Sequence, residues 1–255
     1  MAVTNWTSPR DVFGQRAAQY TTSTCHTDPE VLQKVVALCA PQPHWQVLDA
    51  GTGTGHTALS LAPGVRFVTG IDVTPEMLVE ATKLRCQQGV QNIAFGLADV
   101  AQLPFPDRCF DLITCRRAAH HFPDLGRVLK EMSRVLRPSA TLVVDDRSVP
   151  EEDTVDRLMN EFDRLHDPSH VRQYRPSEWR SMLANAGFEV RTTEMYTKHR
   201  PLSSLTQDLS EVQIRSMISS LRGLGSRQSK MFDLEEREGE LHFNHWYLLV
   251  AATKR

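Results

Sequence analysis

The sequence has no excess of charge of either sign and no long apolar run. Its 29 lysines and arginines are matched by 31 aspartates and glutamates, a formal net charge of -2 over 255 residues. A chain this close to neutral lacks the basic surface that tracks phosphates, so we expect no nucleic-acid partner. No window approaches the roughly 18 consecutive apolar residues of a membrane-spanning helix, and the N-terminus lacks an apolar signal region. We therefore expect no membrane insertion.

Cysteine is scarce and scattered. The five cysteines are odd in number, and none belongs to a C-x-x-C pair or to a zinc-like cluster with histidine. This pattern is typical of reduced thiols in a cytosolic protein and predicts a cytoplasmic location. A chain of this length and average composition buries enough surface for one large core without disulfides.

Apolar runs of strand length alternate with helical patterns from about residue 30 to residue 146. Such alternation is typical of βαβ units and predicts a parallel sheet with helices on both faces. The predicted strands are 46–50, 66–71, 92–95, 110–115 and 140–144. The predicted helices are 29–38, 55–61, 75–88 and 124–136, with Thr74 as the cap of the third and Asp124 opening the fourth.

The alternation stops after Val149. Residues 151–166 have the pattern of an amphipathic helix, and the charged stretch that follows continues no strand–helix alternation, so we interpret 151–175 as an insertion over the sheet. Further along, the sequence predicts a helix at 177–186, a strand at 188–196, a helical stretch at 203–222, a flexible loop at 223–229 and a last strand at 241–253.

Three of the 13 glycines stand at Gly51, Gly53 and Gly55, directly between a predicted strand and a predicted helix. Glycines at such a turn let the backbone approach a ligand, and the helix N-terminus offers unpaired N–H groups, so a nucleotide-type ligand is favoured over a plain turn. His56 occupies the place of the third glycine of a dinucleotide fingerprint, and no Gly-Lys-Ser/Thr of a P-loop follows. We interpret His56 as a surface residue at the helix N-terminus.

Acidic residues stand at the ends of three consecutive predicted strands. Asp49, two residues before the first glycine, would repel a phosphate and is expected to face an ammonium group. Asp72, about 20 residues after the glycines, is placed to accept both ribose hydroxyls, and Asp99 to accept an amino hydrogen of adenine. The carboxyl ends of parallel strands meet in one crevice, so these three residues predict a single binding site.

At these motifs the chain resembles the class I S-adenosylmethionine-dependent methyltransferases, and in particular the ubiquinone/menaquinone-biosynthesis-like small-molecule group. The motifs are VLDAGTGTG, GIDVTPEML and ADVAQLPFPDRCFDLITCRRAAHHFPD, followed by LKEMSRVLRPSATLVV, and the resemblance covers about residues 11–144. It implies a Rossmann-like α/β fold. The sheet would be seven-stranded and mostly parallel, of order 3-2-1-4-5-7-6 with the last strand antiparallel, and would carry an inserted helical cap.

The resemblance also implies S-adenosylmethionine as the cofactor and assigns residues to it. Arg116 would lie near the sulfonium-bearing end, and Tyr20 belongs to a segment similar to the family's N-terminal lid. The candidate cofactor-binding residues are Tyr20, Asp49, Gly51, Thr52, Gly53, Thr54, Asp72, Val73, Met77, Asp99, Val100 and Arg116. We expect one domain made of a lid at 1–28, a cofactor core at 29–149, a cap with the sixth strand at 150–240 and a final strand at 241–255.

Two histidines are the candidate catalytic groups. Methyl transfer is an in-line displacement that needs positioning and, for some acceptors, a base. His121 and His120, in the loop after the fourth strand, are the titratable bases nearest to the expected methyl position, although one of the two rings can equally pack or bond to backbone. The adjacent Asp145 and Asp146 resemble a metal pair, but successive strand residues point to opposite faces, so we predict no metal site.

The acceptor is expected to be a small molecule, because neither a Pro-Pro-aromatic tetrapeptide nor a Pro-Cys nucleophile of the DNA methyltransferases occurs. An apolar substrate wall is expected from the cap residues Met159, Phe162, His166, His170, Tyr174 and Met217. The acceptor atom, whether O, N or C, and the oligomeric state stay open. Two alternatives also remain: an NAD-dependent oxidoreductase, which the glycine spacing disfavours, and a non-catalytic protein that only binds the cofactor.

Overall fold

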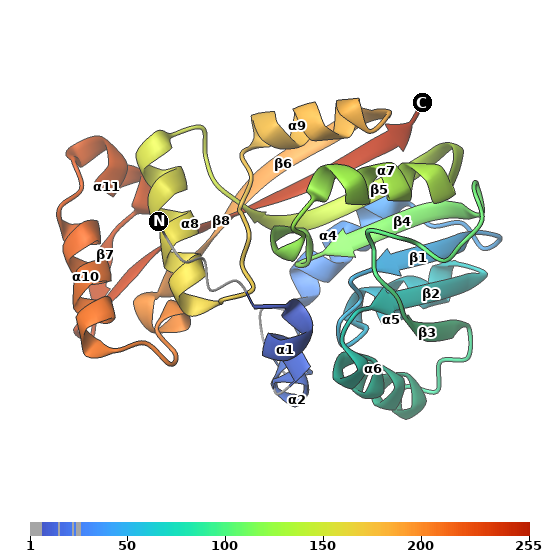
Figure 1. Ribbon diagram of the computed structural model, residues 1–255, viewed down its shortest axis with the longest axis horizontal. Coiled ribbons are helices and arrows are strands. Elements are labelled where there is room, and N and C mark those ends of the chain that lie inside the picture. The colour runs from blue at the N-terminus through green and yellow to red at the C-terminus, as the bar shows by residue number, and fades with distance from the viewer. Residues whose placement is uncertain (1–6, 15, 22, 24–26) are drawn as a thin grey trace.

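The computed structural model describes residues 7–14, 16–21, 23 and 27–255, and a mixed sheet forms its centre (Figure 1). The strand order is β3-β2-β1-β4-β5-β8-β6. The parallel strands are β1 (Gln46–Ala50), β2 (Phe67–Asp72), β3 (Ile93–Leu97), β4 (Phe110–Arg116) and β5 (Leu136–Ser148). The long β8 (Glu240–Lys254) runs antiparallel to both β5 and β6 (Phe188–Pro201). The predicted α/β class, strand order and antiparallel last strand are confirmed.

Helices cover both faces of the sheet and bury one apolar stripe each. On one face, α4 (Pro29–Cys39), α5 (His56–Leu61) and α6 (Pro75–Gln87) pack on the sheet. On the other face lie α7 (Leu125–Val135) and α9 (Pro176–Asn185). In α7 the buried residues recur at helical spacing, at Leu125, Val128, Leu129, Met132 and Val135. The result is a three-layer arrangement whose strands end at a common edge.

A helical cap lies at one end of the sheet, on the left of Figure 1. It consists of α8 (Asp153–His166), the 3-10 turn η3 (Leu202–Leu205), α10 (Glu211–Arg222) and α11 (Ser226–Phe232). Phe162, Met217 and Phe232 fill a cap core together with Phe243 and Trp246 of β8. Because β8 supplies side chains to this core and also pairs in the sheet, the cap is a packed part of the domain.

Two short helices precede the core. α1 (Pro9–Gly14) and α2 (Ala17–Tyr20) lie against α6, between the sheet and the cap. The backbone N–H of Thr7 donates to the Pro168 carbonyl at 3.0 Å, and Arg16 pairs with Asp208 at 2.9 Å. The N-terminal segment therefore connects α6 with the cap end of the molecule.

Several local predictions are wrong. The stretch 223–229 contains the start of α11 rather than only a flexible loop, and the predicted helix at 203–222 is divided into η3 and α10. The short β7 (Glu235–Arg237), which pairs with β8, was not predicted. Thr74 makes no capping bond to α6, because its hydroxyl hydrogen-bonds the Asp72 carboxylate instead. Asp124, by contrast, caps α7 by accepting the Arg127 N–H at 2.9 Å.

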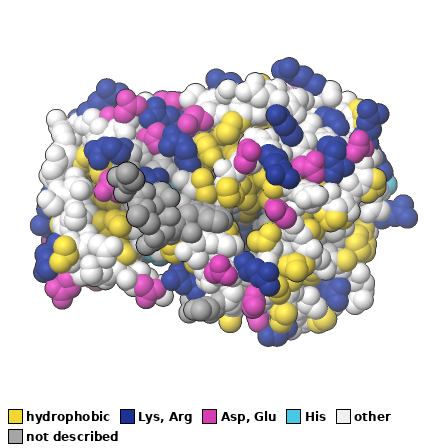
Figure 2. Space-filling model, viewed as in Figure 1, with side chains coloured by type: hydrophobic (Ala, Val, Ile, Leu, Met, Phe, Trp, Pro, Cys, Tyr) yellow, Lys and Arg dark blue, Asp and Glu magenta, His cyan; other side chains and the backbone are white. Residues whose placement is uncertain are grey.

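The surface agrees with the balanced composition. Figure 2 shows Lys, Arg, Asp and Glu side chains intermingled over the displayed face. Within the described ranges, no helix is both long and apolar enough to cross a membrane. Cys39, Cys86, Cys109 and Cys115 are free thiols, and Cys25 lies outside the described residues.

Candidate active site

A cavity of about 730 Å³ opens at the carboxyl ends of the five parallel strands. The turn after β1, the ends of β2 and β3, the loop after β4 and the end of β5 all contribute to its wall. Residues of α1 and α2 and of the cap line its other side. This is where open α/β sheets bind ligands, because loops from several strands converge there.

The glycine turn forms one side of this cavity. Gly51, Gly53 and Gly55 have φ values of +68°, +52° and +85°, which residues with a side chain rarely adopt. A Cβ on Gly51 would lie 2.6 Å from the Ala118 Cβ, so that glycine is needed for packing. A Cβ on Gly53 would meet nothing within 4 Å, because this residue borders the open cavity. Gly53 thus leaves free the volume that a ligand would occupy.

Asp72 faces the turn from the end of β2. Its two carboxylate oxygens accept the N–H of Gly53 and the N–H of Thr74, both at 2.9 Å. Burial raises the pKa of Asp72, and the two N–H donors act in the opposite direction. These bonds fix the carboxylate at the cavity wall beside the glycines.

The other predicted cofactor residues on this side also reach the cavity. Val73 and Met77 follow β2, while Asp99 and Val100 follow β3, and all four line the wall. Met77 and Val100 are buried and form an apolar surface. Asp99 is exposed and accepts the N–H of Ala101 at 2.8 Å, which fixes the turn after β3.

Asp49 does not fulfil its prediction. It is 1% exposed, and its two oxygens accept the hydroxyls of Thr52 at 2.6 Å and Thr114 at 2.7 Å. It is absent from the cavity wall formed by the described residues, so the expected contact with an ammonium group has no geometric support. Asp49 instead ties the glycine turn to β4.

His56 also differs from its prediction as a surface residue. It is partly buried and lines the cavity beside Arg116. Burial lowers the pKa of His56, the Arg116 guanidinium lowers it further, and hydrogen bonds to the backbone of Tyr20 and Thr21 raise it. The ring therefore links the glycine turn to the lid.

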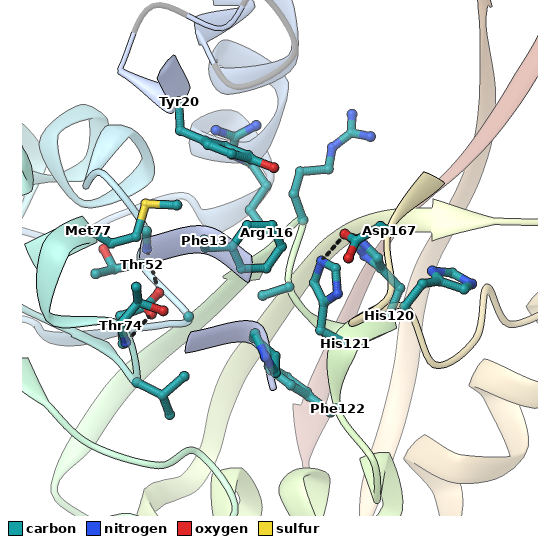
Figure 3. A pocket seen from close by; sticks show the side chains of 18 of the residues that line it. Phe13, Tyr20, Thr52, Thr74, Met77, Arg116, His120, His121, Phe122 and Asp167 are labelled. Carbon is teal, nitrogen blue, oxygen red and sulfur yellow. Dashed lines mark hydrogen bonds and ion pairs between the residues drawn. The ribbon is translucent and has the colours of Figure 1, made fainter. Parts of the chain in front are cut away.

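Arg116 and the lid aromatics occupy the middle of the cavity (Figure 3). Arg116 donates from Nε to the Thr57 hydroxyl at 2.9 Å, and burial lowers its pKa. The Phe13 ring lies edge-on to Tyr20 at 5.5 Å and to His121 at 4.9 Å between ring centroids. Tyr20 and Arg116 both line the cavity, as predicted.

Each of the two predicted catalytic histidines has a carboxylate partner. His120 Nδ1 lies 2.5 Å from Asp146 Oδ1, and the His120 N–H donates to Asp146 Oδ2 at 3.1 Å. His121 Nε2 lies 3.9 Å from Asp167 Oδ2, and its Nδ1 lies 3.1 Å from the Ser169 hydroxyl. Burial lowers the pKa of His120 well below its usual value and raises that of Asp146. His120 is therefore a neutral ring at physiological pH.

The neighbouring Asp145 serves a different partner from Asp146. It accepts from Arg117 Nε at 3.2 Å and from the Tyr196 hydroxyl at 2.6 Å, and Arg117 lies 3.7 Å from the Tyr247 ring centroid. Among the residues that the structure places, no group of three His, Cys, Asp or Glu side chains is arranged to hold a metal ion.

The expected apolar substrate wall is wrong in composition. Met159, Phe162 and Met217 belong to the cap core, and Tyr174 packs beside Trp179; none of these four is on the described cavity wall. Only His166 and His170 of the predicted set line the cavity.

Sequence reasoning missed the charged and polar residues that line the cavity where an apolar wall was expected. The missed lining residues include Arg117, Arg147, Asp163, Asp167, Arg200 and Tyr247. The position of Arg147, at the carboxyl end of the fifth strand, was an available signal. The cap residues reach the cavity only through tertiary packing and carried no local signal.

The α/β fold, together with the glycine turn after β1 and the acidic residues Asp72 and Asp99 at the same edge of the sheet, is typical of a Rossmann-like methyltransferase. Comparisons with known proteins agree. A family model described as a methyltransferase domain matches residues 41–187. The "Uncharacterized methyltransferase YcgJ" of Bacillus subtilis is 38% identical over 172 residues, which are 68% of this chain and 68% of that protein. The chain belongs to the methyltransferase family, and it is an S-adenosylmethionine-dependent methyltransferase.

Solved structures and a curated relative extend the comparison. The YcgJ crystal structure has a TM-score of 0.82 at 30% identity and covers 88% of this chain and 97% of that one. A putative methyltransferase from Bacillus halodurans has a TM-score of 0.83 at 30% identity, with 88% and 98% covered. A demethylmenaquinone methyltransferase from Porphyromonas gingivalis is 34% identical over 122 residues, 46% of this chain and 50% of that protein. The resemblance noted in the sequence is confirmed, and the NAD-dependent alternative is not favoured.

Proposed function

We propose that the half of the cavity around Gly53 and Asp72 holds S-adenosylmethionine and that the half beyond Arg116 holds the methyl acceptor. The observation that carries this proposal is the convergence of the glycine turn, Asp72 and Asp99 on one cavity. When bound, S-adenosylmethionine supplies the electrophilic methyl group. The open volume at Gly53 and the oriented Asp72 carboxylate fit a ligand that has a ribose diol beside an extended chain.

Each wall residue then has a chemical task. Asp72 accepts the ribose hydroxyls, Val73 and Met77 flank the adenine, and Asp99 and Val100 meet its edge. The turn from Gly51 to Thr54 lies along the methionine part. The guanidinium of Arg116 suits the methionine carboxylate, since charge-assisted bonds between these groups are strong. Tyr20 and Phe13 of the lid exclude water from the reacting centre.

The two histidines stand where the acceptor would lie. Figure 3 shows His121 between Phe13 and Asp167, with His120 further from the cofactor side. We assign His121 as the candidate base for an acceptor that must lose a proton, with His120 as its neighbour at 4.0 Å between ring centroids. For an acceptor that attacks with its own lone pair, positioning alone is sufficient.

The chain arrangement supports a division of labour between its parts. We propose a lid at residues 1–28, a cofactor core at 29–149, a cap with β6 at 150–240 and the final strand at 241–255. The cap supplies Asp163, His166 and His170 to the cavity, and the core supplies the glycine turn. A cytoplasmic location remains part of this proposal, on the basis of the scattered thiols.

Calorimetry with S-adenosylhomocysteine and NADH, followed by transfer of labelled methyl to a metabolite extract, tests the proposed function. We expect S-adenosylhomocysteine to bind, NADH not to bind, and label to appear in a small molecule. Binding of NADH alone would contradict the cofactor assignment. Tight cofactor binding without methyl transfer to any fraction would instead support the non-catalytic alternative.

A further inference from the structure

The two halves of the cavity differ in chemical character. The cofactor half presents apolar side chains such as Met77 and Val100 beside the glycines. In the other half, Ala118, Phe122 and Pro123 supply an apolar part of the wall, whereas every described lining residue from Arg147 onward has a charged or hydrogen-bonding side chain. A cavity that binds an apolar acceptor is expected to be lined mainly by hydrophobic and aromatic side chains. The part of the acceptor half formed by the residues from Arg147 onward is therefore suited to a polar group of the acceptor.

Arg147 is held in place within this half by two neighbours. Its Nε lies 2.9 Å from Asp163 Oδ2, and its Nη2 lies 3.3 Å from His245 Nδ1. Its Nη1 has no hydrogen-bond partner in the part of the chain that the structure describes, and the side chain is 15% exposed. The contact of Nε with Asp163 is an ion pair without a hydrogen bond, so this guanidinium keeps N–H groups that can bind an anionic oxygen of a ligand.

The surroundings of Arg147 reinforce its positive charge. Burial is the largest cause that lowers the pKa of His166, and the positive charge of Arg147 is the second. Burial also lowers the pKa of His170, and the charges of His120 and Arg147 lower it further. Burial lowers the pKa of His245, and the charges of Arg147 and Arg200 lower it further. Both arginines therefore act on one ring, and the nearby histidines are neutral at physiological pH.

The carboxylates on this wall are already engaged. Asp163 Oδ2 accepts from Gln173 Nε2 at 2.5 Å in addition to its ion pair with Arg147. Asp167 accepts the Ser169 N–H at 2.8 Å and the Ser169 hydroxyl at 2.6 Å. In contrast, Asp163 Oδ1 and His166 Nδ1 are buried at this wall and have no partner among the described residues. Buried polar atoms of this kind are normally satisfied, and a polar ligand would satisfy them.

We propose that the methyl acceptor is a small polar molecule with an anionic group, a carboxylate or a phosphate, which binds Arg147 with Arg200 nearby. Asp163 Oδ1 then accepts a hydrogen bond from a hydroxyl or amino group of the same molecule. The proposal rests on the proposed function, because it concerns the acceptor half of that cavity. It distinguishes this enzyme from one whose acceptor is a neutral quinone, since a neutral ring offers no anionic oxygen to Arg147.

The test compares matched probes on the full chain saturated with S-adenosylhomocysteine. The probes are 4-hydroxybenzoate, 4-hydroxyphenyl phosphate, the neutral 4-hydroxybenzamide and the neutral hydroquinone menadiol, each titrated by calorimetry. We expect the carboxylate or the phosphate to bind at least about tenfold more tightly than both neutral probes. The tighter of the two anions identifies the group. In the Arg147→Gln variant this preference should disappear.

Control variants separate a local effect from a general one. Arg191→Gln changes an exposed arginine on β6 that pairs with Glu189, and it should keep the preference for anions. Arg200→Gln, on the same strand at the cavity, should weaken it. Should Arg147→Gln fail to fold, Arg147→Gln combined with Asp163→Asn removes both charges of the pair and serves instead. S-adenosylhomocysteine affinity should stay within about twofold in all these variants.

The inference is overturned if a neutral probe binds as tightly as the anions, if no anion binds up to about 20 mM, or if the preference survives the loss of Arg147. Failure of S-adenosylhomocysteine to bind the unmodified protein would instead contradict the proposed function.

Discussion

Replacing Gly53 by alanine separates the cost of the turn conformation from the cost of blocking the ligand. Gly53 has a φ of +52° and open space where a Cβ would project. An alanine in the left-handed region costs roughly 1–2 kcal/mol, partly offset because alanine stiffens the unfolded chain. We expect Gly53→Ala to lower the free energy of unfolding by about 1 kcal/mol. Its methyl group would also project into the cavity that borders the turn.

The affinity loss follows from two effects on the ligand side. The added methyl group occupies ligand volume, and a shift of the turn disturbs the bond from Gly53 N–H to Asp72, which is 2.9 Å long. Hydrogen bonds to charged groups contribute about 1.5–3 kcal/mol. We therefore expect the Kd for S-adenosylhomocysteine to rise by about 10- to 100-fold. Urea titration and calorimetry measure the two quantities separately.

Gly89 provides the matched control. It has a φ of +67°, and a Cβ there would also meet nothing within 4 Å, yet it lies after α6 and outside the described cavity wall. Gly89→Ala should lose similar stability and bind S-adenosylhomocysteine like the unmodified protein. The reasoning is refuted if both variants lose affinity equally, or if Gly53→Ala binds normally.

The remaining predictions concern the ribose site, the base, the cap and one buried carboxylate. Asp72→Ala should weaken S-adenosylhomocysteine binding by about 1.5–3 kcal/mol for each charged hydrogen bond lost, and unchanged affinity by calorimetry would contradict the ribose assignment. Either His121→Asn or His120→Asn, and His121→Asn by the assignment above, should lower kcat by about 10²- to 10⁴-fold for a phenolic acceptor but not for an amine. Unchanged rates and pH profiles in both variants would make both rings structural. Exchanging residues 151–175 for those of a relative should change the accepted substrate, and loss of cofactor binding in a folded chimera would argue against the division of labour. Burial raises the pKa of Asp163 from 3.8 to about 6. Between these two pH values the folded protein therefore binds more protons than the unfolded chain, and the free energy of unfolding falls as pH rises. Urea titrations at pH values near 4 and near 6 should show this fall, and Asp163→Asn should remove it.

The convergence of the glycine turn and the acidic residues at one cavity was predictable, because these residues follow strands in a fixed local order. The glycines, Asp72 and Asp99 each stand just after a buried strand, and parallel strands bring such positions to one edge. Asp49 was misjudged for the opposite reason. Its environment depends on Thr114, which lies 65 residues away on β4 and donates a buried hydrogen bond from its hydroxyl to the Asp49 carboxylate.

The acceptor half was not predictable, because its wall is assembled from distant segments. Asp163 lies on α8, His170 lies in the segment that follows α8, and Arg200 comes from β6. The helical spacing of apolar residues predicts which side chains of the cap are buried, and these side chains fill the cap core instead of lining the cavity. Polar residues that face the cavity have the same local pattern as polar residues that face solvent, so only the packing distinguishes them.

Because of its position, β8 can complete the sheet and the cap core only after it has itself been synthesised. β8 lies between β5 and β6 but follows both in sequence, and its first half closes the cap core through Phe243 and Trp246. Until the residues after Glu240 have emerged from the ribosome, β5 and β6 each have an unpaired edge, and such edges promote aggregation. A nascent chain stalled before this strand would therefore hold a nearly complete cofactor core while remaining a substrate for chaperones and proteases.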